Sequence, residues 1–337
     1  MSKTLLVTGG AGFIASNFIH YLRQHYPDYH IVNVDNMTYA GSVTNLKAID
    51  AENNYDFIEG DIADEQLMNA IFSDYDINGV IHFAAESHVD RSISDVKTFI
   101  ESNVLGTAVL LQAAREAWTK AGEVDKRRFH HVSTDEVYGA LDLDEQVTFN
   151  EQTPLDPRNP YSASKAGADM LVRSFGLTYG MDVVISSSSN NYGPGQHAEK
   201  LIPTVITKAL ASKPVPIYGD GQNVRDWLYV MDHCEALDLV FHSGKTLEKY
   251  NVGGGNEQTN LALAKMICEL VDAFKPGIHS CQDLITFTGD RAGHDRRYAI
   301  DDRKIKHALG WQPSTSFKTG LYNTVKWYVD QWEHVTR

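Results

Sequence analysis

The chain has 337 residues, enough for two domains or for one large α/β unit with an appended lobe. Hydrophobic residues make up 42% and aromatic residues 10%, which excludes a wholly disordered chain. The formal net charge of −14 argues against a nucleic-acid partner or an anionic membrane surface. Three scattered cysteines and the absence of a long apolar run indicate a reduced, cytoplasmic protein without disulfides or a spanning helix.

The first half of the chain alternates strand and helix patterns. Apolar runs predict buried parallel strands at 4–8, 31–35, 79–84, 129–134 and 182–186, with a weaker candidate at 55–58. Helices are predicted at about 13–25, 64–73, 95–120 and 161–179. The first strand begins at Thr4, which argues against a signal peptide. The alternation predicts a Rossmann-type, doubly wound parallel sheet with helices on both faces.

The second half of the chain has a different sequence pattern. Turn residues become frequent after Asn190, and short strands and helices are interleaved there. The last helix is amphipathic, with apolar residues at helical spacing at Phe317, Leu321, Val325 and Tyr328. We therefore expect residues 1–190 to form the Rossmann domain and residues 191–337 a smaller C-terminal α/β lobe, with some exchange of chain between them.

A glycine-rich turn follows the first strand and opens the first helix. Gly9 permits a tight turn, and Gly12 removes the side chain where a pyrophosphate would meet the helix N-terminus. Asp35 ends the second strand, 23 residues after Gly12, where a carboxylate can bind a ribose diol and repel a 2′-phosphate. Glycine turns alone are a weak signal, but this placement predicts NAD rather than NADP. Asp61 is expected either to contact the adenine or to cap a helix.

Tyr161 and Lys165 are four residues apart in a predicted helix, so both side chains share one face. A free tyrosine is a poor base at neutral pH, but a nearby ammonium and a cationic nicotinamide would lower its pKa. Tyr161 could then accept a proton from a substrate hydroxyl. Tyr322 and Lys326 repeat the spacing in the last helix, where we interpret the pair as structural.

Thr134, Asp135 and Glu136 follow the fifth predicted strand. Ligands of open α/β sheets bind at the carboxyl ends of the strands, so these residues should face the same crevice as Tyr161. Taken alone, two adjacent acids are as well explained by a solvated turn. In a desolvated cleft, however, two such carboxyls can be pushed apart in pKa, which leaves one protonated donor and one ionised acceptor.

These motifs resemble the extended short-chain dehydrogenase/reductase family of nucleotide-sugar enzymes, and within it the dTDP-glucose 4,6-dehydratases. The resembling blocks span nearly the whole chain: TGGAGFI at 8–14, VDNMTYAG at 34–41, FAAESHVDRS at 83–92, STDEVYG at 133–139, YSASK at 161–165, SNNYGP at 189–194, EKLIP at 199–203, YGDGQNVRDWLYV at 218–230 and DRAGHDRRYAID at 290–301. Related 4-epimerases usually carry small residues in place of the acid pair. The chain departs from the family's usual loop at Gly195, His197 and Ala198.

The resemblance implies a hydro-lyase that oxidises C4 of the sugar, eliminates water across C5–C6 and returns the hydride to C6, giving a 4-keto-6-deoxy sugar nucleotide. Tyr161, with Lys165 beside it, deprotonates the 4-hydroxyl while NAD takes the hydride, and Thr134 polarises that oxygen. Glu136 removes the C5 proton as general base. Asp135 protonates the leaving C6 hydroxyl. The product is a precursor of deoxysugars, with L-rhamnose as the usual destination.

The resemblance also implies two sets of binding residues. Around NAD it places Gly9, Gly12, Phe13, Ile14, Asp35, Asn36, Met37, Thr38, Asp61, Ile62, Phe83, Ala84, Ala85, Ser87, Ser102, Tyr161, Lys165 and Asn191. Around the nucleotide sugar it places Ser87, Thr134, Asn190, Lys200, Leu201, Pro216, Ile217, Tyr218, Arg225, Asn260, Arg291 and His294. In this set Arg225 and Arg291 would meet the diphosphate, although a lone arginine is also explained by a surface ion pair.

Three alternatives stay open from the sequence. The substrate could be UDP- or CDP-glucose, because base selection depends on few contacts. The enzyme could be a nucleotide-sugar 4-epimerase, or, more remotely, the chain could be a non-catalytic NAD-binding scaffold. No metal-ligand spacing occurs among the 14 histidines, so no metal is expected. The resemblance implies a homodimer built from the helices near 98–118 and 161–177.

Overall fold

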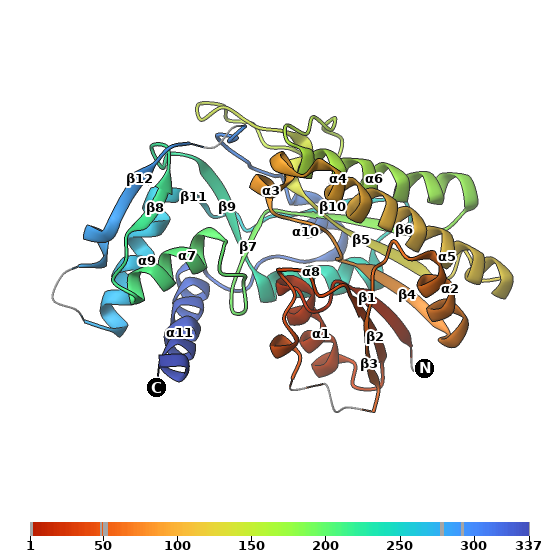
Figure 1. Cartoon of the computed structure of the whole chain (residues 1–337). Helices are drawn as coiled ribbons and strands as arrows, with labels where there is room; N and C mark the ends of the chain where they lie inside the picture. The colour runs from red at the N-terminus through yellow and green to blue at the C-terminus, as the bar shows by residue number, and fades with distance from the viewer. Residues whose placement is uncertain (1–2, 48, 50–52, 277–279, 291–292, 337) are drawn as a thin grey trace.

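The computed structural model describes residues 3–47, 49, 53–276, 280–290 and 293–336. Its largest sheet is wholly parallel, in the order β10-β6-β5-β4-β1-β2-β3 (Figure 1). The strands are β1 (Thr4–Thr8), β2 (His30–Asp35), β3 (Tyr55–Glu59), β4 (Ile77–His82), β5 (Arg128–Thr134), β6 (Asp182–Ser188) and β10 (Lys249–Val252). The strand order reverses between β1 and β4, which is where ligands of such sheets bind. The predicted doubly wound sheet is confirmed.

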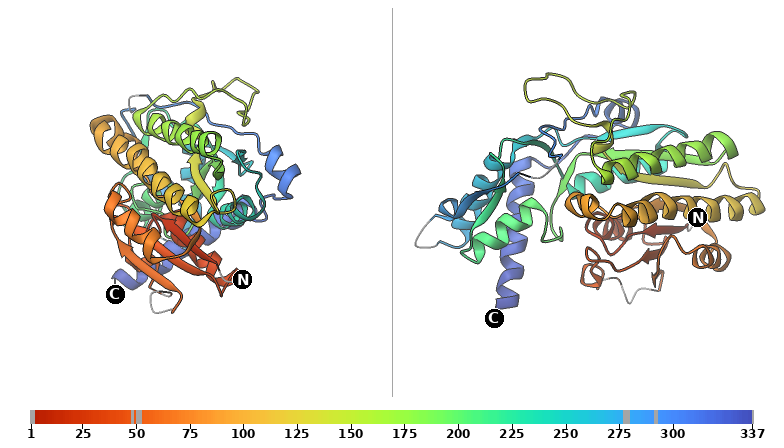
Figure 2. Two further views of the ribbon diagram at one scale, coloured as in Figure 1. Left: turned by 90° about the vertical axis from the view of Figure 1, so that its right-hand side faces the viewer. Right: turned by 45° about the horizontal axis from the view of Figure 1, so that its top comes forward.

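Helices cover both faces of this sheet, as Figures 1 and 2 show. One face packs against α1 (Phe13–His25) and α8 (Val230–Ser243) through a buried apolar cluster. The other face packs against α2 (Glu65–Asp74), α5 (Gly106–Ala121) and α6 (Pro160–Tyr179), with Trp118 at 0% exposure among them. Burial of apolar area on both faces supplies most of the driving force for this layer arrangement.

The helix predicted at about 95–120 is present as α4 (Val96–Phe99), a π-helical segment η2 (Ile100–Leu105) and α5, which follow one another directly. The short helix α3 (Val89–Ser94), which was not predicted, precedes it. Asp95 leaves the helical conformation at φ −140°, and its carboxylate accepts the backbone N–H of Thr98 to begin α4. In η2, the buried Asn103 side chain bonds both backbone groups of Glu86. Such π segments are frequent at functional sites, and this one ties the helix to the loop after β4.

The second lobe has its own core. A small sheet of order β11-β9-β7 joins Glu257–Thr259, Val224–Tyr229 and Asn190–Tyr192, and a two-stranded sheet pairs β12 (Ile285–Thr288) with β8 (Val215–Tyr218). The helices of this half are α7 (Leu201–Leu210), α9 (Asn260–Phe274), α10 (Arg303–Leu309) and α11 (Phe317–Thr336). Leu321 and Val325 of α11 are buried in this core, which confirms the predicted amphipathic helix.

Two elements of the second half of the chain belong to the first sheet. Strand β10 extends it beyond β6, and α8 packs on it beside α1. The division at residue 190 stays a prediction, but the carboxyl ends of the strands face the second lobe (Figure 1).

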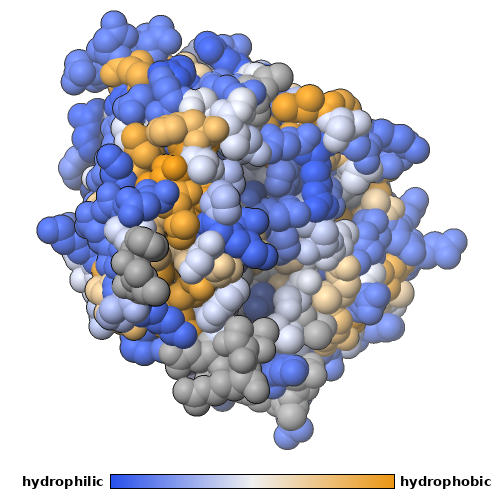
Figure 3. Space-filling view, turned by 60° about the vertical axis from the view of Figure 1, so that its left-hand side comes forward, coloured by the Kyte–Doolittle hydropathy of each residue, from blue (hydrophilic) through white to orange (hydrophobic). Residues whose placement is uncertain are grey.

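The surface drawn in Figure 3 is mostly hydrophilic, with hydrophobic side chains confined to patches. Within the described ranges, no helix is both long and apolar enough to cross a membrane.

Candidate active site

A cavity of about 430 Å³ opens at the carboxyl ends of β1, β2, β4 and β5. The five expected catalytic residues line it: Thr134, Asp135, Glu136, Tyr161 and Lys165. So do most of the expected NAD residues: Gly9, Gly12, Phe13, Ile14, Asp35, Asn36, Thr38, Asp61, Ile62, Phe83, Ala84, Ala85, Ser87, Ser102 and Asn191. Met37 lies outside this lining, and its backbone N–H donates to Asp35 at 2.8 Å.

The glycine turn brings backbone close to backbone. Gly9 has φ +73°, and a Cβ there would lie 2.7 Å from the backbone of Ala84 on the neighbouring strand end. Gly12 is the N-cap of α1 and leaves the first N–H groups of that helix uncovered by a side chain. A helix N-terminus without a side chain in the way accommodates a pyrophosphate.

Asp35 closes the other side of this turn. Its carboxylate is 8% exposed and accepts the backbone N–H groups of Ala11 at 2.9 Å and of Met37. Burial raises the pKa of Asp35, and the two hydrogen bonds oppose that rise. Asp61, at the end of the next strand, accepts from Asn36 and from the N–H of Ala63, so it both lines the cavity and caps a turn.

Local sequence fixes Tyr161 and Lys165 on α6. Asn159 and Ser162 form a capping box around Pro160, so the helix begins immediately before Tyr161. Both side chains are buried, and the Lys165 Nζ donates to the Val132 carbonyl oxygen at 2.8 Å.

With the protein's own groups alone, the pKa of Tyr161 is raised and not lowered, although Lys165 is on the same helix. Burial, and then the Glu136 carboxylate, raise the pKa of Tyr161, and hydrogen bonding to Thr134 opposes this only in part. The second pair lies elsewhere: Tyr322 is 46% exposed on α11, and Lys326 pairs with Asp330 at 2.6 Å. That pair is a surface feature.

The acid pair starts a short 3₁₀ turn (Asp135–Tyr138) at the end of β5. Thr134 caps this turn by accepting the Glu136 N–H at 3.3 Å, and its hydroxyl donates to Asp135 Oδ1 at 3.4 Å. Asp135 is 2% exposed, and its Oδ2 has no hydrogen-bond partner among the described residues. Burial, followed by the neighbouring Glu136, raises the pKa of Asp135 well above its usual range, which favours the protonated form of this carboxyl.

The residues expected around a nucleotide sugar are only partly brought together. Ser87, Thr134, Asn190 and Lys200 line the cavity, and Lys200 donates to the Ser87 carbonyl oxygen at 3.1 Å. Outside the lining lie Leu201 at the start of α7, Pro216, Ile217 and Tyr218 on β8, Arg225 on β9, Asn260 at the start of α9, and His294. Arg291 lies outside the described residues.

Two of these outlying residues have defined surroundings. The Arg225 guanidinium donates to the carbonyl oxygens of Val224 at 2.8 Å and Asp295 at 2.9 Å, and lies 4.3 Å from the Tyr298 ring centroid. Its charge also opposes the rise in the pKa of Asp135, so Arg225 acts on the acid pair from β9. His294 is paired with Asp290 at 2.6 Å.

Several cavity residues were missed by sequence reasoning: Tyr39, Glu86, Thr98, Glu101, Gln196 and His197. Tyr39 and Glu86 stand inside motif blocks, which was a usable signal. The His197 ring meets the Tyr39 ring edge-on at 5.5 Å, so this departure from the family's usual loop supplies an aromatic contact. Within the described part of the chain, no cluster of His, Cys, Asp and Glu side chains could hold a metal ion.

Comparison with known proteins agrees with this geometry. Residues 6–324 match the family described as GDP-mannose 4,6 dehydratase. A dTDP-glucose 4,6-dehydratase of Haemophilus influenzae is 49% identical over 96% of this chain and 97% of its own length. The crystal structure of a dTDP-glucose 4,6-dehydratase from Streptomyces venezuelae with NAD bound has a TM-score of 0.90 and 43% identity, covering 98% of each chain.

A UDP-glucose 4-epimerase of Thermotoga maritima with UDP-glucose has a TM-score of 0.85 but only 29% identity, over 98% of this chain and 99% of that one. The fold is therefore shared with epimerases, while sequence identity is higher with the dehydratases. The chain belongs to the GDP-mannose 4,6 dehydratase family and, within it, to the dTDP-glucose 4,6-dehydratases.

Proposed function

We propose that this chain converts dTDP-glucose to dTDP-4-keto-6-deoxyglucose and water with bound NAD. The observation that carries the proposal is the position of Asp135 and Glu136, which line the same cavity as Tyr161 and Thr134. A 4-epimerase needs an acid/base group at C4 only, whereas elimination of water also needs a base at C5 and an acid at O6.

NAD fits the side of the cavity built by the glycine turn. The uncovered helix N-terminus at Gly12 suits the pyrophosphate, and the Asp35 carboxylate suits a ribose diol. Tyr161 and Lys165 line the same cavity and would lie beside the reacting ring of the cofactor. When bound there, NAD supplies the chemistry of accepting a hydride from C4 of the sugar and returning it to C6.

Tyr161 is the base at the 4-hydroxyl. Burial and Glu136 raise the pKa of Tyr161, so a positive charge that the protein's side chains do not supply is needed to stabilise the phenolate. A cationic nicotinamide ring would provide that charge. Thr134 hydrogen-bonds to Tyr161 and can orient the same hydroxyl. Lys165, fixed by the Val132 carbonyl, has further N–H donors to hold a ribose.

Asp135 is the acid that protonates the departing 6-hydroxyl, because burial and the neighbouring Glu136 raise its pKa well above the usual range. Glu136 is the base that removes the C5 proton, which the 4-ketone has made acidic. Adjacent carboxyls in opposite protonation states suit a concerted or stepwise loss of water.

The nucleotide would extend from the cavity towards the second lobe. Lys200 and Arg225 carry the charge that a diphosphate needs in an acidic protein, with Arg291 and His294 as the further expected contacts. Tyr218 packs edge-on against His294 at 6.3 Å between ring centroids, and it lies on the same strand, β8, as Pro216 and Ile217. With Asn260, this region is the proposed base-binding end.

We also propose a homodimer in the cytoplasm. Exposed apolar side chains gather on η2 and α6, the segments expected at the dimer interface: Ile100, Leu105, Met170 and Leu177 are 45–61% exposed. The free thiols Cys234, Cys268 and Cys281 suit a reducing compartment. Light scattering on the purified protein tests the dimer, and a monomeric mass would contradict it.

A substrate panel tests the proposed activity. The purified protein is incubated separately with dTDP-, UDP- and CDP-glucose, and the products are examined by mass spectrometry and NMR. We expect loss of one water from dTDP-glucose at the highest rate. A faster reaction with UDP- or CDP-glucose would show that the enzyme prefers a nucleotide base other than thymine. A product of unchanged mass with inverted C4 would show that the enzyme is an epimerase.

A further inference from the structure

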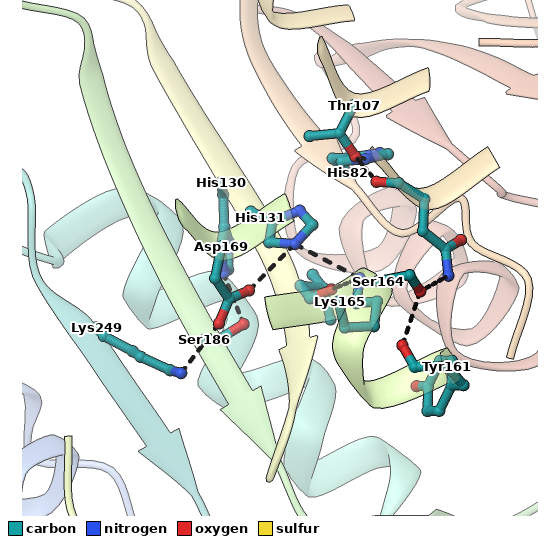
Figure 4. Close-up of polar contacts among 12 residues, drawn as sticks. His82, Thr107, His130, His131, Tyr161, Ser164, Lys165, Asp169, Ser186 and Lys249 are labelled. Atoms are coloured by element: carbon teal, nitrogen blue, oxygen red, sulfur yellow. Dashed lines mark hydrogen bonds and ion pairs between the residues drawn. The ribbon is translucent and has the colours of Figure 1, made fainter. Parts of the chain in front are cut away.

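Asp169 lies on α6 one turn beyond Lys165 and two turns beyond Tyr161, on the same face of the helix. It is 2% exposed, yet it has two cationic or polar partners (Figure 4). Lys249 Nζ lies 3.0 Å from its Oδ2, and His131 Nε2 lies 3.4 Å from its Oδ1. Burial alone would raise the pKa of Asp169, but Lys249 first and His131 next hold it well below the usual value. Asp169 is therefore a buried, ionised carboxylate.

His131 stands between this carboxylate and the active-site lysine. Its Nε2 is 3.5 Å from Lys165 Nζ as well as 3.4 Å from Asp169 Oδ1. Burial, and then the Lys165 charge, lower the pKa of His131 to about 4, so the ring is neutral at neutral pH. A neutral imidazole fills the gap between ammonium and carboxylate without adding a charge of its own.

Lys165 is 4% exposed; its Nζ donates to the Val132 carbonyl oxygen at 2.8 Å and lies 3.5 Å from His131 Nε2. Burial lowers the pKa of Lys165 to about 8, and the Asp169 carboxylate opposes that loss of charge. Four other titratable side chains lie near this group: His82 on β4, whose pKa burial also lowers, His130 on β5, Tyr138, whose ring centroid is 4.4 Å from Lys249 Nζ, and Tyr161 on the same helix. Asp169 is the anion in this group, and Lys249 on β10 is the cation behind it.

We propose that Asp169, with His131 in front of it and Lys249 behind it, is a positioning residue that keeps Lys165 charged and aimed at the cavity. The outermost strand β10, which comes from the second half of the chain, thereby contributes to the active site. The inference rests on the proposed function, because Lys165 matters here for oxidation at C4.

The test measures the rate of C4 oxidation separately from the later steps. In a Glu136→Gln background, elimination should stall, so the rate at which enzyme-bound reduced cofactor appears in the near ultraviolet reports the first step. We compare this rate with and without Asp169→Asn in the holoenzyme from about pH 6 to about pH 10, which brackets the histidine and lysine titrations. In Asp169→Asn, the fall in rate at alkaline pH should begin about one pH unit lower than in the parent. At acidic pH the rate of the variant should return to that of the parent.

Three companion variants separate positioning from general damage. Asp169→Glu keeps the charge and should restore the parent profile. Lys249→Met removes the cation that holds Asp169 ionised and should, like Asp169→Asn, move the alkaline loss of rate to lower pH. Asp182→Asn, which breaks the ion pair with Arg128 at 2.9 Å on the same sheet, should leave the profile where it was.

A second readout needs no turnover. Since the folded pKa of Lys165 lies below that of a free lysine, stability rises with pH between the two values. Asp169→Asn should extend this slope to lower pH, so its Tm should fall more than that of Asp182→Asn on going from about pH 9 to about pH 7.

The outcomes are distinct. An equal loss of rate at every pH with an unmoved alkaline limb, or a parent-like profile in Asp169→Asn, would overturn the inference. If Asp169→Asn does not fold, an unmoved limb in Lys249→Met would do the same. If Glu136→Gln alone yields no reduced cofactor from dTDP-glucose, the proposed function has failed instead.

Discussion

The Thr134 hydroxyl donates to Oδ1 of Asp135 at 3.4 Å, so consecutive residues at the end of β5 join the two halves of the chemistry. Thr134 is hydrogen-bonded to the tyrosine proposed to act at C4, and Asp135 is the acid proposed to act at C6. One strand end thus brings the groups proposed for oxidation and for elimination to a single cavity, where a substrate bound in one pose could use them in turn.

Tyr161→Phe should lower kcat about 10²-fold or more, because it removes the C4 base while keeping a ring that packs edge-on near Phe99. KM for dTDP-glucose should change little. Steady-state kinetics on the variant check this. Tyr322→Phe is the matched control, since it alters the surface copy of the same spacing, and an equal loss in both variants would contradict the assignment.

Glu136→Gln should oxidise the sugar but stall before water leaves. The amide cannot accept the C5 proton, so enzyme-bound reduced cofactor should accumulate and absorb in the near ultraviolet. Stopped-flow absorbance after mixing with dTDP-glucose measures this. Normal turnover by the variant would show that another group is the base.

Asp135→Asn should lose activity by about 10²-fold or more, yet be more stable than the parent at neutral and alkaline pH. The raised pKa of Asp135 means that the folded state prefers the neutral carboxyl, so its stability is greatest below the pKa of the unfolded chain and falls as pH rises through the folded pKa. Asparagine carries no such charge. Thermal denaturation over a pH series should show a stability difference in favour of the variant that grows with pH; a constant difference would be evidence against a raised pKa.

Asp35→Asn should weaken NAD binding about tenfold or more, because a hydrogen bond to a charged group at a buried site is lost. It should also narrow the preference for NAD over NADP, since the carboxylate no longer repels a 2′-phosphate. Equilibrium titration with both cofactors after removal of bound NAD gives the two dissociation constants. An unchanged ratio between them would remove Asp35 from the cofactor assignment.

The parallel sheet, the glycine turn and the acid pair could be predicted from sequence because each is encoded by neighbouring residues. Apart from β3, which is the weaker run YDFIE, the β-strands of the first half are short apolar runs, and the glycine turn stands directly between strand and helix. The acid pair follows β5 without an intervening residue, so its place at the carboxyl end of the sheet follows from chain direction alone.

Other parts depend on contacts between distant segments and have no local signal. Strand β10 has four residues and an ordinary composition, and only its pairing with β6 brings Lys249 to Asp169. The π-helical segment η2 has no such signal either, because it depends on the Asn103 side chain reaching the backbone of Glu86. The position of Arg225 relative to Asp135 depends on how β9 lies beside β7, and no sequence spacing encodes that.

The most direct test of the central claim uses dTDP-glucose carrying deuterium at C4, with no added NAD, followed by mass spectrometry and NMR of the product. The account predicts that one water is lost and that the deuterium arrives at C6. Recovery of a sugar that keeps its mass and holds the deuterium at an inverted C4 would contradict it.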